Sequence, residues 1–203
     1  MSVLPLCIEP HPVLRGRARR VEAFTGELRR LVKDLTETMY ANDGIGLAAP
    51  QVGHDLQVLV ANPSRAIGRE LVIINPVLEE ARGRTGVVEG CLSVPEVWER
   101  VRRAAHVRLR GQDANGAPIT VEADGLLAIV LQHELDHLQG RLFVDRLPWF
   151  RRWRLGRQRR LAATRAWSVG EPQRPPARAP GPSLERTGAG GVHERRAGAQ
   201  ARG

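Results

Sequence analysis

Hydrophobic positions in the chain change their spacing several times, and each spacing predicts a different element. Between residues 25 and 42 the apolar positions recur at steps of three and four, which predicts an amphipathic helix with Thr25 as its N-cap. These positions are Leu28, Leu31, Val32, Leu35 and Met39.

Strand-like patterns follow this helix. They cover residues 56–62, 70–80, 85–98, 105–113 and 117–124. An Asn-Pro pair ends or bends each of the first two. Asn115-Gly116 between the last two predicts a β-hairpin, because this pair favours a tight turn between alternating apolar runs.

Residues 125–140, GLLAIVLQHELDHLQG, are apolar on most sides and predict a largely buried helix. Asp124 is its expected cap and Gly140 its expected C-terminal stop. A further helix is expected over about residues 148–167. From residue 168 the chain is rich in Pro, Gly, Ala and Arg with almost no large apolar residues, which predicts disorder.

Composition places the chain among ordinary globular proteins, with 42% hydrophobic and 26% charged residues. No apolar run approaches the roughly 18 residues of a membrane span, and the start lacks the features of a secretory signal. Two cysteines are too few for a disulfide scaffold, so a cytoplasmic location is expected.

The net charge of +9 comes from the C-terminal part of the chain. Residues 1–145 carry 17 Lys and Arg against 19 Asp and Glu, whereas residues 146–167 carry eight arginines and no acid. Residues 168–203 add six arginines and three glutamates. The basicity therefore does not belong to the main domain.

The stretch HELDH, residues 133–137, has the His-Glu-x-x-His pattern of metal-dependent hydrolases. His133 and His137 lie four residues apart on a predicted helix, so both can bind one cation. Glu134 stays near the same rim, where it can contact a water without binding the metal.

A catalytic site of this kind needs a third protein ligand. Downstream of the motif, Asp145 and His193 are the candidates, and neither is well placed. Upstream, Cys91 lies in a turn-like context, EGCLSVP, and a thiolate binds zinc or iron(II) strongly. Cys7 is expected to be a buried core residue.

Three stretches together resemble the signature motifs of peptide deformylases, in order and at suitable spacings. They are GIGLAAPQ (44–51), EGCLS (89–93) and QHELDHLQG (132–140). The resemblance extends over residues 8–155. It implies an α+β fold, with antiparallel sheets packed around a central metal-binding HExxH helix. The basic C-terminal helix and the disordered tail that complete the expected architecture come from the composition of the chain, since the resemblance leaves the tail out. The expected division is a catalytic domain (1–147), a basic helix (148–167) and a tail (168–203).

The resemblance also implies an activity, the removal of the N-formyl group from the formyl-methionine of nascent proteins with release of formate. The metal ligands would be Cys91, His133 and His137. Glu134 would be the general acid and base, and the Gln51 amide and the Leu92 N–H would stabilise the oxyanion. Iron(II) is the expected native metal, and zinc or nickel is expected as a replacement in purified protein.

Helical spacing places Leu126, Ile129 and Val130 on the face of His133, where they would line a pocket for the methionine side chain. Ile45 and Val87 would join them if the motifs converge, as they do in the family's pocket. Gly44 and Gly46 would let the backbone approach the substrate closely, or would simply form a tight turn.

Two acidic residues near the motifs are not expected to act in catalysis. Glu89 needs a partner within an apolar wall, and Arg102 or Arg103 can supply it. Asp136 is expected to face away from the ligand pair, either at the surface or behind the ligands.

The arginine-rich segment 146–167, which also holds three of the four tryptophans, is expected to dock on ribosomal RNA. An anionic membrane surface and a solvated helix with its tryptophans packed on the domain are the alternatives. For the whole chain, the rival interpretations are a zinc peptidase, a nucleic-acid-binding protein with a structural metal, and a deformylase relative that has lost activity.

Overall fold

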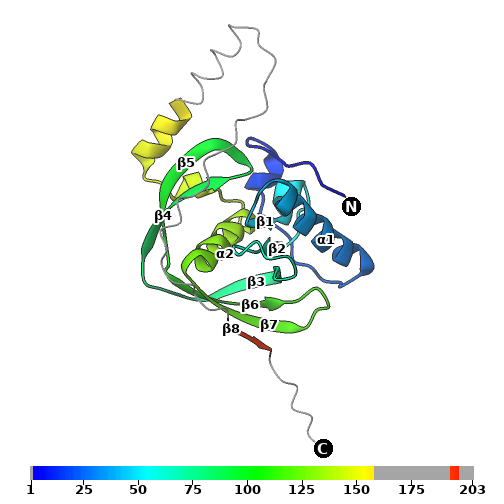
Figure 1. Ribbon diagram of the computed structural model, residues 1–203. Helices are drawn as coiled ribbons and strands as arrows, with labels where there is room; N and C mark the ends of the chain where they lie inside the picture. The colour runs from blue at the N-terminus through cyan, green and yellow to red at the C-terminus, as the bar shows by residue number, and fades with distance from the viewer. Residues whose placement is uncertain (1, 158–192, 197–203) are drawn as a thin grey trace, which may run out of the picture.

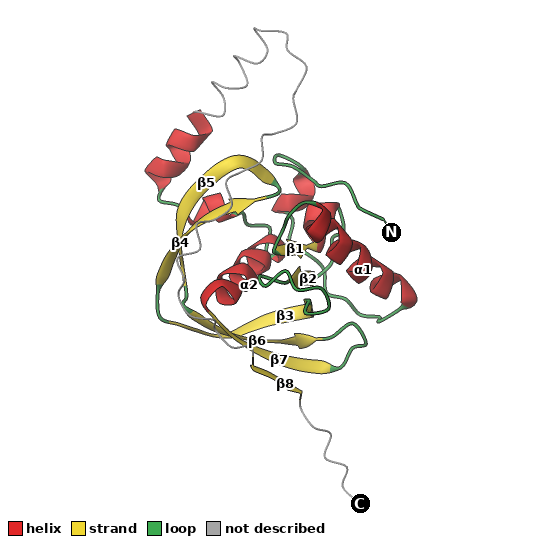
Figure 2. Cartoon of the chain, in the orientation of Figure 1, coloured by secondary structure: helices red, strands yellow, loops and turns green. Residues whose placement is uncertain are grey.

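The computed structural model describes residues 2–157 and 193–196. Figures 1 and 2 show helix α2 at the centre, with a large sheet below it, a strand hairpin on one side and helix α1 on the other. The helices are α1 (Gly26–Ala41), α2 (Gly125–Leu138), and the 3-10 turns η1 (Pro12–Arg15), η2 (Ala49–Val52) and η3 (Phe143–Arg146). The strands are β1 (Gly46–Ala48), β2 (Val58–Ala61), β3 (Leu71–Arg82), β4 (Thr85–Cys91), β5 (Val94–Arg103), β6 (His106–Gln112), β7 (Pro118–Asp124) and β8 (His193–Arg196).

The described strands form two antiparallel sheets. One has the order β1-β2-β3-β6-β7-β8, and the other consists of β4 and β5 alone. The expected combination of helices and antiparallel sheets is confirmed. Residues 149–157 are also helical, and no helix of the described chain is long and apolar enough to cross a membrane.

Strand β2 is buried on both faces, which explains its continuous apolar sequence. Val58 and Val60 pack with the apolar stripe of α1, whereas Leu59 and Ala61 pack with residues of α2. Because successive side chains of a strand point to opposite faces, one short strand joins two cores. The two helices therefore lie on opposite faces of this part of the sheet.

Both predicted main helices occur close to their expected bounds. The Thr25 hydroxyl accepts a hydrogen bond from the Leu28 N–H at 3.4 Å and caps α1. At α2, Asp124 occupies the N-cap position, but its carboxylate bonds His106 at 3.0 Å instead of capping the helix. Gly140 adopts a left-handed backbone with φ 68° and donates to the His137 carbonyl, so the expected stop is confirmed.

Some strand predictions need correction. The stretch 85–98 is not one strand but a hairpin, in which the chain reverses between Cys91 and Val94. The β6–β7 hairpin is present, but its loop covers residues 113–117, with the Asp113 carboxylate accepting two backbone N–H groups and Gly116 at φ 87°.

Disorder was expected from residue 168 onward, but residues 193–196 form strand β8 and pair with β7. An exposed sheet edge offers unpaired backbone groups to any extended segment, so composition alone does not exclude pairing there. The rest of the tail, and residues 158–167 of the expected basic helix, lie outside the described residues.

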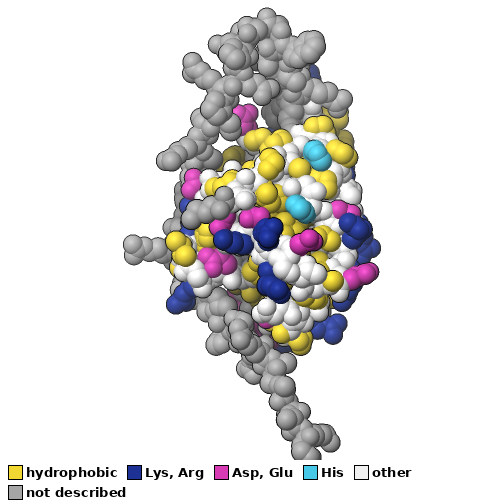
Figure 3. Space-filling view, turned by 90° about the vertical axis from the view of Figure 1, so that its right-hand side faces the viewer, with side chains coloured by type: hydrophobic (Ala, Val, Ile, Leu, Met, Phe, Trp, Pro, Cys, Tyr) yellow, Lys and Arg dark blue, Asp and Glu magenta, His cyan; other side chains and the backbone are white. Residues whose placement is uncertain are grey.

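Charges on the main domain are mixed. Figure 3 shows basic and acidic side chains interspersed with apolar ones on the face that carries α1, with no field of a single sign. This distribution agrees with the near-neutral balance of residues 1–145.

Candidate metal centre

Helix α2 and the end of β4 bring three metal-binding side chains together. His133 and His137 stand one turn apart, with ring centroids separated by 5.0 Å. The Cys91 Sγ lies 3.3 Å from His137 Nε2, and the ligand atoms of all three residues lie within 4.8 Å of one another. Residues 42 positions apart in the sequence therefore converge as expected.

The donor set suits a divalent transition metal. One thiolate and two imidazoles are ligands that zinc and iron(II) accept, and three protein ligands leave a position open for water or substrate. The Nδ1 atom of His133 bonds Glu89 at 2.8 Å, which leaves Nε2 as the nitrogen that can bind a cation. The site thus has the chemistry of a divalent metal centre with an open position.

Glu89 holds His133 from behind and is itself held by arginine. Arg103 donates to the two Glu89 oxygens at 2.7 and 2.8 Å. Burial alone would raise the pKa of Glu89, but the hydrogen bonds from Arg103 and His133 lower it to about 2. The expected partner is therefore Arg103 and not Arg102, and Glu89 is an ionised support of the ligand.

Asp136 is not a surface residue, because only 2% of it is exposed. Its carboxylate accepts a hydrogen bond from Arg103 at 2.6 Å and another from Arg146 at 3.0 Å. Asp136 therefore belongs to the layer behind the ligands. The sequence already suggested a partner for Asp136, because a carboxylate on a largely buried helix needs one.

Glu134 is 3% exposed and lies beside the ligands. Burial raises its pKa to about 7, and its Oε2 atom has no hydrogen-bond partner among the described residues. A carboxyl group with these properties can both accept and donate a proton near neutral pH.

Gly46 leaves room for Glu134. A Cβ atom at position 46 would collide with Glu134 Oε1 and would lie 2.7 Å from Val130 Cγ1. Gly46 was expected either to let the substrate approach or to form a tight turn; in the structure its missing side chain faces α2. A Cβ at Gly44 would lie 3.1 Å from the Met39 carbonyl, so both glycines serve close packing within the protein.

The Gln51 amide faces the same cluster. Its Oε1 accepts the Ala48 N–H at 2.9 Å, which orients the Nε2 group to within 3.6 Å of Cys91 Sγ and 3.3 Å of Ser93 Oγ. Leu92 lies in the turn after Cys91, where β4 passes into β5. Ser93 is fully buried; it is the last residue of the EGCLS motif, but no role was predicted for it from the sequence.

The residues expected to form the methionine pocket converge in part. Val130 belongs to the core cluster of α2, and Ile45 and Leu126 pack against this cluster. Ile129 is buried on the same helix, and Val87 is half-buried on β4. Among the described residues neither belongs to that cluster, so the structure joins three of the five.

The alternative third ligand Asp145 lies away from the metal-binding cluster. The Asp145 carboxylate accepts the Leu142 N–H at 2.8 Å and pairs with Arg15, so it is engaged away from the histidines. Within residues 2–157 no fourth His, Cys, Asp or Glu joins the three ligands. This geometry disfavours both a peptidase ligand set and a closed structural site.

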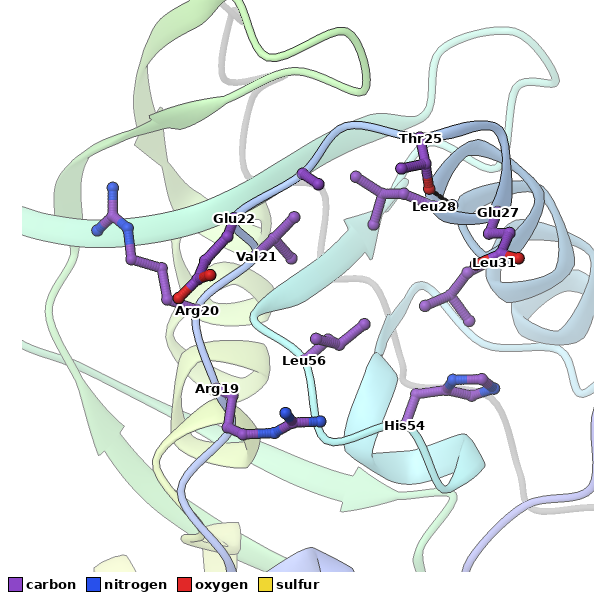
Figure 4. Close-up of a pocket in the computed structure, with 11 residues that line it drawn as sticks. Arg19, Arg20, Val21, Glu22, Thr25, Glu27, Leu28, Leu31, His54 and Leu56 are labelled. Carbon is purple, nitrogen blue, oxygen red and sulfur yellow. Dashed lines mark hydrogen bonds between the residues drawn. The ribbon is translucent and has the colours of Figure 1, made fainter.

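A separate groove of ≈ 630 Å³ lies between residues 19–25, the first turns of α1 and the segment around His54 (Figure 4). Apolar side chains form its floor and charged ones its rim. Its lining contains none of the residues predicted for the metal site, so it is a different feature of the surface.

Comparisons with known proteins agree with this site. The family described as polypeptide deformylase matches residues 3–153. A peptide deformylase from Legionella pneumophila is 36% identical, with a TM-score of 0.76, over 84% of this chain and 100% of its own. For the enzyme from Thermus thermophilus the identity is 41% and the TM-score 0.74, over 80% of this chain and 96% of its own. A deformylase from Synechococcus elongatus, solved with actinonin, is 44% identical with a TM-score of 0.70, over 73% and 83%. The chain therefore belongs to the peptide deformylase family, the hydrolases that remove the N-formyl group from nascent proteins.

Proposed function

We propose that Cys91, His133 and His137 hold the catalytic cation and that Glu134 moves the proton during deformylation. The observation that carries this proposal is the convergence of the three ligand atoms within 4.8 Å, with the buried Glu134 carboxyl beside them. A cation bound there would supply Lewis acidity, which activates water and polarises the formyl carbonyl.

The protein's own groups supply the remaining steps. Glu134 accepts a proton from the attacking water and returns it to the leaving amine, a change from base to acid for which a pKa of about 7 is well suited. The Gln51 Nε2 group and the Leu92 N–H donate to the oxyanion that develops on the formyl group. Donors of this kind are typically worth about 3–4 kcal/mol each.

Iron(II) is the proposed native cation, with zinc or nickel as replacements in purified protein. The thiolate and two imidazoles suit all three ions, so the choice depends on metal supply and on oxygen. Since the substrate arises during translation, we propose that the protein acts in the cytoplasm.

The methionine side chain is proposed to lie against Ile45, Leu126 and Val130, with Ile129 and Val87 nearby. Apolar contact of this kind discriminates by only about 1–3 kcal/mol, so selectivity for the first residue should be graded. Gly44 and Ile45 directly precede β1, which begins at Gly46 and is an edge strand among the described strands of its sheet. An extended peptide could therefore pair with β1.

Glu134→Gln tests the proton-transfer role. Formate release from formyl-Met-Ala-Ser should fall by about 10²–10⁴-fold with the cation still bound, because general acid–base catalysis contributes a factor of that size. Glu122→Gln is the matched control, since Glu122 lies on β7 and pairs with Arg108. Near-wild-type turnover in cation-loaded Glu134→Gln would remove Glu134 from this role.

Cys91→Ala tests the ligand set independently of activity. Metal content should fall in this variant and stay unchanged in Cys7→Ala, because Cys7 lies outside the cluster. Full occupancy after loss of Cys91 would show that the third ligand lies elsewhere.

The C-terminal segment is proposed to dock the enzyme on ribosomal RNA. We divide the chain accordingly into a catalytic domain (1–147), a basic helix (148–167) and a tail (168–203). Eight arginines without an acid in residues 146–167 support this proposal, because such segments bind phosphates in a salt-dependent way.

One observation favours a second partner, an anionic membrane surface. Trp149 and Trp153 are 78% and 62% exposed, whereas Arg151 and Arg154 pair with Glu99 of β5. Exposed aromatic side chains suit a lipid interface. They also disfavour the alternative in which these two tryptophans pack on the domain.

Co-sedimentation of the full chain and of a chain ending at residue 147 separates the two partners. For RNA docking, the full chain should pellet with ribosomes at low salt and be released at high salt, and the shortened chain should not pellet. Binding to anionic vesicles but not to ribosomes would favour the membrane instead.

A further inference from the structure

Four charged side chains form a continuous row behind the metal centre. Arg103 lies between two buried carboxylates, Glu89 and Asp136, and is itself buried. Arg146 approaches Asp136 from the outside, through Nε to Oδ2 at 3.0 Å and through Nη2 to Oδ1. The two acids balance the two arginines in charge. Glu89, Arg103 and Asp136 are buried, whereas the Arg146 side chain at the outer end of the row is 42% exposed.

Turn η3 contributes two residues that reach His133 by different routes. The Phe143 ring stacks on the His133 ring, with centroids 6.0 Å apart and planes inclined by 25°. Arg146, three residues later, reaches the same ligand through Asp136, Arg103 and Glu89. The turn therefore contacts the ring directly and also supports the hydrogen bond to its Nδ1 atom.

We propose that Arg146 is a positioning residue for the metal ligand His133. Its guanidinium contacts both oxygens of Asp136, so this carboxylate is held in one orientation. Asp136 in turn holds the Arg103 guanidinium, and Arg103 holds the Glu89 carboxylate that orients the imidazole. Outer partners of this kind fix the ring of a metal-binding histidine and raise its affinity for the cation.

A positioning role and a simple charge effect of Arg146 predict opposite changes in cation affinity when this residue is replaced. If Arg146 acted only as a positive charge near the site, its removal would strengthen the binding of a cation, because one repulsive charge is lost. If Arg146 orients Asp136, its removal weakens binding. A lysine at position 146 keeps the charge but cannot form the two-pronged contact.

Cobalt(II) affinity of the metal-free full chain, measured against a competing chelator, tests this role without relying on activity. Arg146→Gln and Arg146→Lys should both bind cobalt about 10-fold more weakly, the lower end of the range for outer partners. Their cobalt-loaded visible spectra should also differ from that of the wild type. Arg141→Gln is the matched control, an exposed arginine with no side-chain contact to Asp136 in the structure, and should retain wild-type affinity.

Several outcomes would overturn the proposal. Tighter cobalt binding by Arg146→Gln, or wild-type affinity in Arg146→Lys, would show that only charge matters. Unchanged affinity and spectra in both variants would show that Arg146 has no role at the metal. Equal weakening in Arg141→Gln would show that the loss of affinity is not specific to the contact between Arg146 and Asp136. The proposal concerns cation binding, so it stands or falls separately from the role of Glu134.

Discussion

Replacing Gly46 with alanine tests whether β1 and α2 pack closely enough to fix the Glu134 carboxyl. The new Cβ would lie 2.7 Å from Val130 Cγ1 and would overlap Glu134 Oε1. Carbon atoms in contact normally lie about 3.5–4.0 Å apart, so one element must move by on the order of 1 Å. Both Val130 and Glu134 are buried, so neither side chain can swing into solvent.

The expected cost has two parts. Inserting a methyl group into packed surroundings destabilises a protein by about 1–3 kcal/mol. A displacement of about 1 Å at a reacting group can lower the rate about 100-fold. We therefore expect Gly46→Ala to retain its metal, to unfold at a somewhat lower denaturant concentration, and to lose about 100-fold in kcat for formate release.

Gly26→Ala is the matched control, because a Cβ at Gly26 would have no atom within 4 Å. It should keep full activity and gain up to about 1 kcal/mol in stability, since alanine restricts the unfolded chain. A Gly46→Ala enzyme with wild-type kcat would refute the argument. If only KM rose, Gly46 would act by admitting the substrate backbone and not by placing Glu134.

Three further substitutions and one treatment test other parts of the site. Arg103→Met should lower the free energy of unfolding by about 3–5 kcal/mol, because the buried Glu89 and Asp136 carboxylates lose the guanidinium that they share; a smaller loss in urea titrations would mean that water replaces it. Gly90→Ala would place a Cβ 2.6 Å from the Trp98 ring, and the half-exposed ring should swing outward, so a change in tryptophan fluorescence is expected with little loss of stability. Tyr40→Phe removes a hydroxyl that accepts from Asn62 at 2.6 Å, and a loss of about 1 kcal/mol is expected; an unchanged denaturation midpoint would contradict it. Dialysis against a strong chelator should abolish formate release and added iron(II) should restore it, whereas persistent activity in metal-free protein would contradict the assigned chemistry.

The sequence predicted an element correctly where residues next to that element mark its ends. Helix α2 was predictable because its apolar positions lie within the segment and Gly140, which stops it, follows directly after its last turn. The β4–β5 hairpin was read as a single extended segment, because its turn at Leu92-Ser93 lacks the glycine or asparagine that usually marks a reversal.

Of the charged residues behind the metal site, only the pairing of Glu89 with an arginine of the next strand could be predicted from the sequence. A buried Glu89 requires a cation, and the neighbouring strand offered two. The link from Arg103 to Asp136, and from Asp136 to Arg146, depends on how β5, α2 and η3 pack together. No spacing in one sequence encodes such a tertiary arrangement.

X-ray absorption spectroscopy of the zinc-loaded full chain tests the metal centre most directly. We expect one sulfur at about 2.3 Å and two imidazole nitrogens at about 2.0–2.1 Å, from Cys91, His133 and His137. A first shell without sulfur, or with two sulfurs, would contradict the ligand set on which the proposed chemistry depends.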